Sequence, residues 1–174
     1  MKTSHLKLVP LSEEYAEELL PLWNDFEVIK YTNASQLNTI EECKDRIQSF
    51  LEQEPYDVIR DYVILFHNEV IGIVGTPIID EEAKEAGFYY QLKRNYWGEG
   101  FGYEAARAVL RHAMVNLNMN TIYADSVVAN PASIRILRRL GFEETGIERK
   151  GFCNNGIEMN VIHFQMRQEA LVGC

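Results

Sequence analysis

The sequence predicts a mixed α/β fold in which one largely antiparallel sheet carries helices on both faces. Short stretches of alternating or continuous apolar residues predict strands, and longer stretches with apolar residues at helical spacing predict helices between them. The order of these elements combines hairpins with strand–helix–strand crossovers, which is typical of a mixed sheet. We expect about seven strands, mostly antiparallel, and four helices.

The first third of the chain predicts one strand and two helices. Residues 6–11 alternate between apolar and other side chains, as in a strand. Ser12 is placed to cap a helix whose apolar residues recur at helical spacing. Thr39 and Glu42 form the pattern of a capping box, which predicts that a second amphipathic helix covers residues 40–51.

A β-hairpin follows in the middle of the chain. Residues 62–66 and 69–74 are apolar strands, and His67 with Asn68 forms the turn between them. We therefore interpret His67 as a turn residue and not as a ligand. Residues 87–92 are a further strand candidate.

The second half of the chain alternates between helices and strands. The predicted elements are a helix over residues 103–118, a strand over 121–128, a helix over 130–140, and strands over 143–151 and 158–166. Gly141 is placed to end the second of these helices. The sequence Asn-Asn-Gly at 154–156 predicts a tight turn between the last two strands.

Length and composition favour one soluble domain over residues 1–174. Hydrophobic residues make up 47% of the chain and charged residues 25%, and the net charge is −9. An acidic field disfavours nucleic acid as a partner and favours a cationic substrate such as an amine, although it also serves solubility alone. We find no signal peptide and no apolar run long enough for a membrane, so we expect a cytoplasmic protein.

The cysteines predict neither a metal site nor a disulfide framework. Cys43, Cys153 and Cys174 match no zinc-binding spacing, and their number is odd. We therefore expect a protein without a metal cofactor.

The strongest chemical signal is a glycine-rich stretch between a predicted strand and a predicted helix. Gly98, Gly100 and Gly102 allow successive backbone N–H groups to turn toward one point. The helix that follows adds unpaired N–H groups and the positive end of its dipole. Together they predict a site for a phosphate or diphosphate group, and because its donors act at contact distance, the negative net charge does not exclude an anionic cofactor.

Two other interpretations fit the glycines alone. The first is a flexible turn that binds nothing. The second is a dinucleotide fingerprint, whose last position needs Gly or Ala but holds Tyr103 here if Gly98 comes first, with Asp125 at a tolerable distance for the ribose contact. The hairpin before the loop disfavours a nicotinamide-dependent oxidoreductase, because that fingerprint opens a βαβ unit.

Two motifs in the right order resemble the GNAT superfamily of N-acetyltransferases. The family loop reads (Arg/Gln)-x-x-Gly-x-(Gly/Ala), and Gly100-Phe101-Gly102 matches its glycine half. Residues 96–101, with Trp97 where Arg or Gln is usual, resemble the RimJ/RimL-like branch of ribosomal-protein N-acetyltransferases. Residues 130–142 resemble the family's Asn-x-x-Ser-x-x-(Val/Leu)-Leu-x-(Lys/Arg)-Leu-Gly-Phe. The resemblance covers nearly the whole chain.

The resemblance implies a GNAT-like acyl-CoA N-acyltransferase fold with acetyl-coenzyme A as co-substrate. In this family the pantetheine arm lies along the strand before the loop, which a bulge splays open. Asn130 is implied to bond the pantetheine and Ser133 to lie near the sulfur as a possible general acid, although Ser133 also fits a helix N-cap. The residues implied in cofactor binding are Gln91, Leu92, Lys93, Trp97, Gly98, Glu99, Gly100, Phe101, Gly102, Asn130 and Ser133. Arg138 and Arg139 either reach the cofactor's phosphates or form a solvated helix face.

The implied reaction is direct attack of an amine on the thioester in a ternary complex. A backbone N–H of Gln91 or Leu92 is expected to stabilise the oxyanion. The general base is harder to assign, because Phe152 stands where some relatives carry a Glu. Glu85 is our candidate for this role, and Glu148 and Glu158 are the alternatives.

The expected acceptor is a protein N-terminal α-amine or a small-molecule amine. Asn160 replaces the acidic residue that is usual in the last strand of the branch. Trp23, Phe26 and Tyr31 either line the acceptor groove or belong to the core. The alternative function is a catalytically silent sensor or scaffold that binds coenzyme A. The chain is expected to be a monomer or a homodimer.

Overall fold

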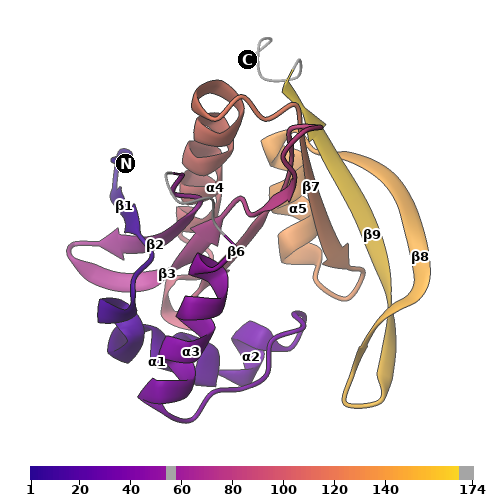
Figure 1. Ribbon diagram of the computed structural model, residues 1–174. Helices are drawn as coiled ribbons and strands as arrows, with labels where there is room; N and C mark the ends of the chain where they lie inside the picture. Colours follow the sequence, from indigo (N-terminus) through magenta and orange to yellow (C-terminus); the bar gives the residue numbers. More distant parts are fainter. Residues whose placement is uncertain (54–57, 169–174) are drawn as a thin grey trace.

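The computed structural model describes residues 1–53 and 58–168, and its strands form two sheets (Figure 1). The N-terminal sheet is antiparallel throughout, in the order β1-β2-β3-β6. Its strands are β1 (Leu6–Pro10), β2 (Asp61–Phe66), β3 (Glu69–Gly75) and β6 (Tyr89–Leu92).

The C-terminal sheet has the order β4-β5-β7-β9-β8, and only its β5–β7 pair is parallel. Its strands are β4 (Ile78–Asp80), β5 (Glu85–Gly87), β7 (Thr121–Val127), β8 (Glu143–Asn154) and β9 (Ile157–Arg167). The predicted mixed α/β class is confirmed, with nine strands and five α-helices in the described residues where about seven and four were expected, but the single sheet that was predicted is wrong, because the strands form two sheets.

The two sheets diverge at Phe88, which separates β5 from β6. Gly87 is the last residue that pairs with β7, opposite Tyr123, and Tyr89 already pairs with β3. Phe88 packs against the hydrophobic cores of both sheets. The strand predicted over 87–92 is therefore two strands in different sheets, and β6 and β7 do not pair with each other.

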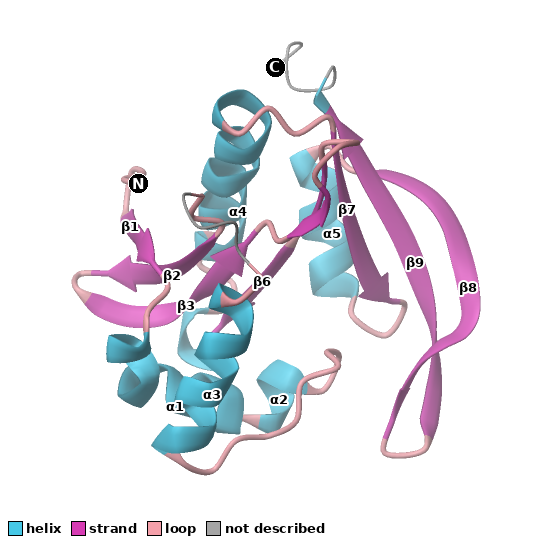
Figure 2. Cartoon of the chain, in the orientation of Figure 1, coloured by secondary structure: helices cyan, strands magenta, loops and turns pink. Residues whose placement is uncertain are grey.

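Helices cover both faces of the N-terminal sheet (Figure 2). On one face lie α1 (Ala16–Asn24), α2 (Phe26–Ile29) and α3 (Ile40–Leu51), which pack on Val63, Leu65 and Ile73. On the other face α4 (Phe101–Arg111) packs on Ile64 and Ile71. Because side chains alternate along a strand, β2 is buried on both sides and reads as a continuous apolar run.

The C-terminal sheet packs on α4 and on α5 (Pro131–Leu140). Ile122 and Ala124 of β7 and Phe164 of β9 point toward these helices. The residues between them point to the opposite face of the sheet, which we call the open face. This face lies on the same side of the molecule as α1–α3. Among the helices that the structure describes, none is long and apolar enough to cross a membrane.

Several local predictions are confirmed, and two need correction. The hairpin turn has His67 and Asn68 at φ 49° and 66°, and Gly141 ends α5 at φ 95°. Ser12 precedes a 3-10 turn (Glu13–Tyr15), but its side chain makes no capping bond, so that prediction is wrong. The helix predicted over 103–118 begins earlier, at Phe101, and changes to a π-helix over His112–Asn116.

The capping box of α3 gives a direct test of local stability. Thr39 accepts from the Glu42 N–H, and the Glu42 carboxylate accepts from the Thr39 N–H. We expect Thr39→Ala to lower the free energy of unfolding by about 1 kcal/mol, measured by urea denaturation. Ser12→Ala is the matched control and should cost nothing, since the buried Ser12 hydroxyl has no partner among the described residues. Equal losses in both variants would contradict the capping argument.

Candidate active site

The glycine loop lies between β6 and α4 and requires glycine for two different reasons. Gly98 and Gly100 adopt φ 85° and 86°, a left-handed conformation that side chains disfavour, although a Cβ at either would meet nothing within 4 Å. At Gly102 a Cβ would lie 3.0 Å from the Tyr90 ring. The first two glycines therefore shape the loop, and the third allows α4 to pack closely on β6.

The N-terminus of α4 presents unpaired donors beside this loop. Its first intrahelical bond runs from the Glu104 N–H to the Gly100 carbonyl, and Gly100 provides no capping side chain. The N–H groups of Phe101, Gly102 and Tyr103 therefore have no intrahelical acceptor. Together with the positive end of the helix dipole, they form a site suited to a phosphate group.

The edge of β6 that faces away from β3 carries backbone groups for a ligand. The Lys93 N–H donates to the Ile71 carbonyl, and bonding sides alternate along an antiparallel strand. Gln91 and Lys93 therefore pair with β3, whereas Tyr90 and Leu92 face away from it. Of the two N–H groups considered for the oxyanion, only that of Leu92 lies on the free edge.

Trp97 connects the loop to this edge. Its indole N–H donates to the Leu92 carbonyl at 2.8 Å, although the side chain is about half exposed. The carbonyl of Leu92 is thus occupied, while its N–H points away from β3. The Trp97 side chain thus connects the end of β6 to the glycine loop, at a position where the GNAT pattern usually has Arg or Gln.

At the start of α5, Asn130 and not Ser133 is the N-cap. The Asn130 side chain accepts from the Ser133 N–H at 3.2 Å, so the capping interpretation of Ser133 is wrong. The Ser133 hydroxyl lies near enough to the Tyr90 phenol to lower the pKa of that phenol. Burial raises the pKa of Tyr90 to about 12, against the lowering effect of Ser133, so the phenol stays protonated at neutral pH.

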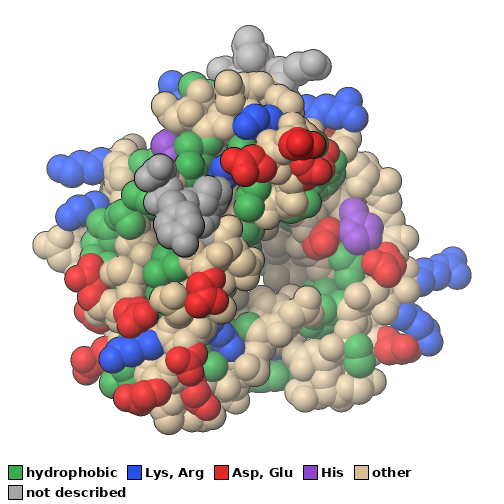
Figure 3. Space-filling model, viewed as in Figure 1, with side chains coloured by type: hydrophobic (Ala, Val, Ile, Leu, Met, Phe, Trp, Pro, Cys, Tyr) green, Lys and Arg blue, Asp and Glu red, His purple; other side chains and the backbone are tan. Residues whose placement is uncertain are grey.

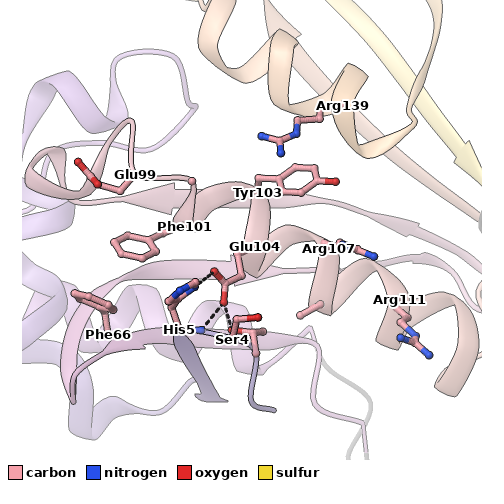
Figure 4. Close-up of a pocket in the computed structure, with 13 residues that line it drawn as sticks. Ser4, His5, Phe66, Glu99, Phe101, Tyr103, Glu104, Arg107, Arg111 and Arg139 are labelled. Atoms are coloured by element: carbon pink, nitrogen blue, oxygen red, sulfur yellow. Dashed lines mark hydrogen bonds and ion pairs between the residues drawn. The ribbon is translucent and has the colours of Figure 1, made fainter. Parts of the chain in front are cut away.

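A cavity of about 720 Å³ lies beside the loop and the outer side of α4 (Figure 4). Arg107, Arg111 and Arg139 contribute positive charge to its lining. The Arg139 guanidinium lies over the Tyr103 ring, 4.1 Å from its centroid. Glu99 and Phe101 of the loop also line the cavity. The cavity therefore suits a large, negatively charged group with a planar ring.

The N-terminal segment closes one side of this cavity. Glu104 accepts from the Thr3 hydroxyl at 2.5 Å and from the His5 N–H at 2.8 Å, and it pairs with the His5 ring (Figure 4). These bonds to Thr3 and His5 lower the pKa of Glu104, although burial acts in the opposite direction. Of the two arginines of α5 that were considered as phosphate ligands, only Arg139 lines the cavity. Arg138 instead forms an ion pair with Glu144.

The molecular surface is also hollowed on the side of the diverging sheets opposite to the cavity beside α4 (Figure 3). The hollow lies between the half formed by α1–α3 and the half formed by the C-terminal strands, and acidic side chains and a histidine lie on the latter side. Trp23 is fully buried and donates to the Gln91 side chain at 2.8 Å, so it belongs to the core. Phe26 is exposed, and Tyr31 packs on Val127 and Val161 of the open face.

The predicted base candidates lie in different surroundings. Glu85 accepts from the Tyr123 hydroxyl at 3.0 Å. Glu158 forms an exposed ion pair with Lys150 at 2.6 Å. Glu148 instead lies on the open face, 3.4 Å from the ring of His163.

His163 of β9 is a further residue of the open face that the sequence motifs do not indicate as a site residue. Its ring lies 2.7 Å from Asp125 on the paired strand β7. The two residues are 38 positions apart, so only the strand register brings them together. The alternation along residues 158–166 was visible in the sequence, but the register was not.

The cysteines form no cluster in the described residues. Cys43 is buried between α3 and the sheet, where burial raises the pKa of its thiol to about 11, and Cys153 is exposed. Cys174 lies outside the described residues. No group of three or more His, Cys, Asp or Glu side chains in residues 1–53 and 58–168 is arranged to hold a metal ion.

Two sheets that diverge beside a glycine loop, with a helix N-terminus at that loop, are the arrangement that the resemblance implies for an N-acyltransferase that uses acyl-coenzyme A. Residues 5–143 match the family model of the acetyltransferase (GNAT) domain. The chain belongs to the GNAT family and is an N-acetyltransferase that uses acetyl-coenzyme A.

Individual relatives agree with this assignment. The chain is 31% identical to the uncharacterized N-acetyltransferase p20 of Bacillus licheniformis over 98% of this chain and 97% of the relative. It is 26% identical to spermidine N(1)-acetyltransferase of Escherichia coli, with 93% and 86% covered. The fold matches that of RimL, the ribosomal L7/L12 α-N-protein acetyltransferase solved with coenzyme A, with a TM-score of 0.88 at 21% identity and 97% of each chain covered.

Proposed function

We propose that this enzyme binds acetyl-coenzyme A across the divergence of its two sheets and acetylates a primary amine held in the acidic hollow. The observation that carries the proposal is the continuity between the glycine loop, the free edge of β6 and the gap between β6 and β7. A diphosphate bound at the loop directs the pantetheine arm along this edge, and the thioester then lies between the cavity side and the hollow side of the molecule.

The loop and the cavity suit the nucleotide half of the cofactor. The N–H groups from Gly98 to Gly102 hold the diphosphate, since a charge-assisted hydrogen bond contributes about 1.5–3 kcal/mol. Arg139 and the Tyr103 ring lie in the cavity next to it. Gln91, Lys93 and Phe101 support the shape of this site through their pairing and packing, and Glu99 lines the cavity beside it. Asn130 fixes the start of α5 beside the pantetheine arm.

The chain provides one group that stabilises the oxyanion and one that protonates the leaving thiolate. The Leu92 N–H lies on the free edge and stabilises the oxyanion that forms on the thioester carbonyl. Ser133, whose backbone N–H is held by the Asn130 side chain, donates a proton to the leaving thiolate. A thiol with a pKa near 8.5 gains only modestly from such an acid, so Ser133 assists the reaction without being indispensable.

The acceptor we propose is a primary amine of a small polycation or of a peptide N-terminus. The acidic hollow favours cationic acceptors, and one relative is a spermidine acetyltransferase. Deprotonating an alkylamine with a pKa near 10.4 costs about 4.6 kcal/mol at pH 7, whereas an α-amine near 7.7–8.0 costs about 1–1.4 kcal/mol. An alkylamine acceptor therefore depends strongly on a general base.

Release of free thiol from acetyl-coenzyme A tests the proposal. We expect release with spermidine or with a short peptide that has a free N-terminus, and none with the N-acetylated peptide. Tight binding of coenzyme A without thiol release from any amine would instead identify a catalytically silent sensor or scaffold.

We also propose that residues 1–174 form one GNAT domain that acts in the cytoplasm as a monomer or homodimer. The phosphate, amine and thioester sites all lie on elements between β1 and β9. Nucleic acid and membrane are not among the proposed partners.

A further inference from the structure

One histidine on the open face of the C-terminal sheet lies between two carboxylates. His163 of β9 has its Nδ1 at 2.7 Å from Asp125 on β7 and its Nε2 at 3.4 Å from Glu148 on β8. The bulge of β8 after Glu148 shapes this arrangement, because a side chain at Gly151 would lie 2.8 Å from the Glu148 carboxylate. The two neighbouring strands thus each contribute one acid to the ring.

The hydrogen-bond roles at this ring leave one position for a donor. With Nδ1 protonated and donating to Asp125, Nε2 carries a lone pair that faces the Glu148 carboxylate. In the protonated ring the Nε2–H itself faces Glu148, whereas in the neutral ring Nε2 and the carboxylate are two acceptors that repel each other unless a donor lies against both. A primary ammonium group has three N–H donors and can bond to Nε2 and to Glu148 at once. The neutral ring and the carboxylate therefore form a receptor for a primary ammonium.

The position of His163 and Glu148 relative to the gap between β6 and β7 suits a role in the attack of the amine on the thioester. Asp125 comes two residues after Tyr123, where the pairing of β7 with β5 ends. Its side chain lies on the open face, whereas Ser133 lies on α5, on the opposite face of the same sheet. A thioester in the gap between β6 and β7 then has an acid on one side and the His163 ring on the other. Tyr31 packs on the neighbouring Val127 and Val161, which limits this part of the hollow.

We propose that His163 is the general base of the acetyl transfer, that Asp125 is its positioning residue, and that Glu148 binds the ammonium form of the acceptor. This inference rests on the proposed function and names the base and the amine site that it leaves open. Glu85, the base candidate from the sequence, is engaged with Tyr123 instead.

The proton balance of the reaction assigns one step to each group. Nε2 of His163 takes a proton from the bound ammonium, and the neutral amine attacks the thioester carbonyl carbon. A C–N bond forms, the C–S bond breaks, and the thiolate leaves with its electron pair and takes a proton from Ser133. The nitrogen loses its second proton and becomes an amide, the serine is reprotonated, and His163 releases its proton to solvent, so that one proton is released overall.

The surroundings of the ring raise the pKa of His163 above its usual range. The hydrogen bond to Asp125 raises the pKa of His163, and the charges of Asp125 and Glu148 and the bond with Glu148 add to it, whereas burial acts in the opposite direction. The facing titratable groups are Asp125 from β7 and Glu148 from β8, and the nearby Tyr123 is bonded to Glu85. A base must be neutral to act, so the rate should rise as the pH passes upward through this raised pKa.

The test compares His163→Asn with wild type, using spermidine as acceptor over a range of pH. We expect kcat/KM to fall by about 100- to 1,000-fold and the rise of the rate with pH to disappear, with coenzyme A affinity unchanged. Asp125→Asn should move the rise to lower pH, and Glu148→Gln should mainly raise the KM for spermidine. His67→Asn, in the β2–β3 turn, is the matched control and should behave as wild type. A variant at His163 that keeps the wild-type rate and pH profile would overturn the proposal.

A second acceptor separates a base from a structural residue. Trifluoroethylamine is largely uncharged at neutral pH, so its transfer needs little help from a base before attack. We expect His163→Asn to lose much less activity with trifluoroethylamine than with spermidine. Equal losses with both amines would show that His163 only supports the structure.

Nuclear magnetic resonance of the His163 ring tests the amine site independently of turnover. Spermidine should shift the ring signals in wild type and much less in Glu148→Gln. Absence of a shift in wild type would overturn the amine site, even where acetyl transfer occurs. A wild-type protein that shows the shift but releases no thiol would leave the amine site standing and refute the proposed function.

Discussion

Gly100→Val is expected to weaken coenzyme A binding by about 10- to 100-fold, measured by isothermal titration calorimetry. Gly100 has φ 86°, which a β-branched residue adopts only with strain, so the loop must change its course. The N–H groups then no longer converge on the diphosphate. Losing one charge-assisted hydrogen bond costs about 1.5–3 kcal/mol, and each 1.4 kcal/mol is a factor of ten in affinity.

Gly146→Val is the matched control for this substitution. Gly146 lies in β8 at ordinary φ, and a Cβ there meets nothing within 4 Å. We expect wild-type affinity and little change in melting temperature. If Gly100→Val bound coenzyme A as tightly as this control, the loop could not be the diphosphate site.

Gly72→Ala is expected to lower the free energy of unfolding by about 3 kcal/mol, measured by urea denaturation. A Cβ at Gly72 would lie 2.1 Å from the Gln91 carbonyl oxygen and 3.0 Å from the Leu92 Cα. These are backbone atoms of β6, which cannot move without breaking its pairing with β3. Because the pantetheine arm is proposed to lie along the edge of β6, coenzyme A affinity should fall as well.

Gly87→Ala tests whether this cost is specific to the β3–β6 contact. Gly87 ends β5, and a Cβ there would meet its nearest neighbour, the Pro77 side chain, at 3.4 Å, an ordinary contact. We expect a loss below about 1 kcal/mol. Similar losses at Gly72 and Gly87 would indicate that general strand propensity, and not the close approach, requires glycine.

Features that depend on neighbouring residues were predictable from the sequence. The capping box of Thr39 and Glu42, the turn at His67 and Asn68, and the helix end at Gly141 each need only a short segment to form. The position of the glycine loop between a strand and a helix belongs to the same group, and its role as an anion site stays a prediction. The two motifs at residues 96–101 and 130–142 resemble the GNAT superfamily, and this resemblance predicted the overall fold.

Features that depend on pairing between distant segments were not predictable. The division of residues 85–92 at Phe88 follows from which strand lies beside each half, and the sequence of that segment does not reveal it. Trp97 stands where the family pattern has Arg or Gln, and its bond to the Leu92 carbonyl could not be read from that pattern. His163 and Asp125 meet only through the register of β7 and β9.

The most direct test of this account is a crystal structure with bound coenzyme A. We predict the diphosphate against the N–H groups of residues 98–102, and the pantetheine arm along the edge of β6 with its thiol in the gap before β7. Well-defined density for the cofactor anywhere else on the molecule would contradict the account.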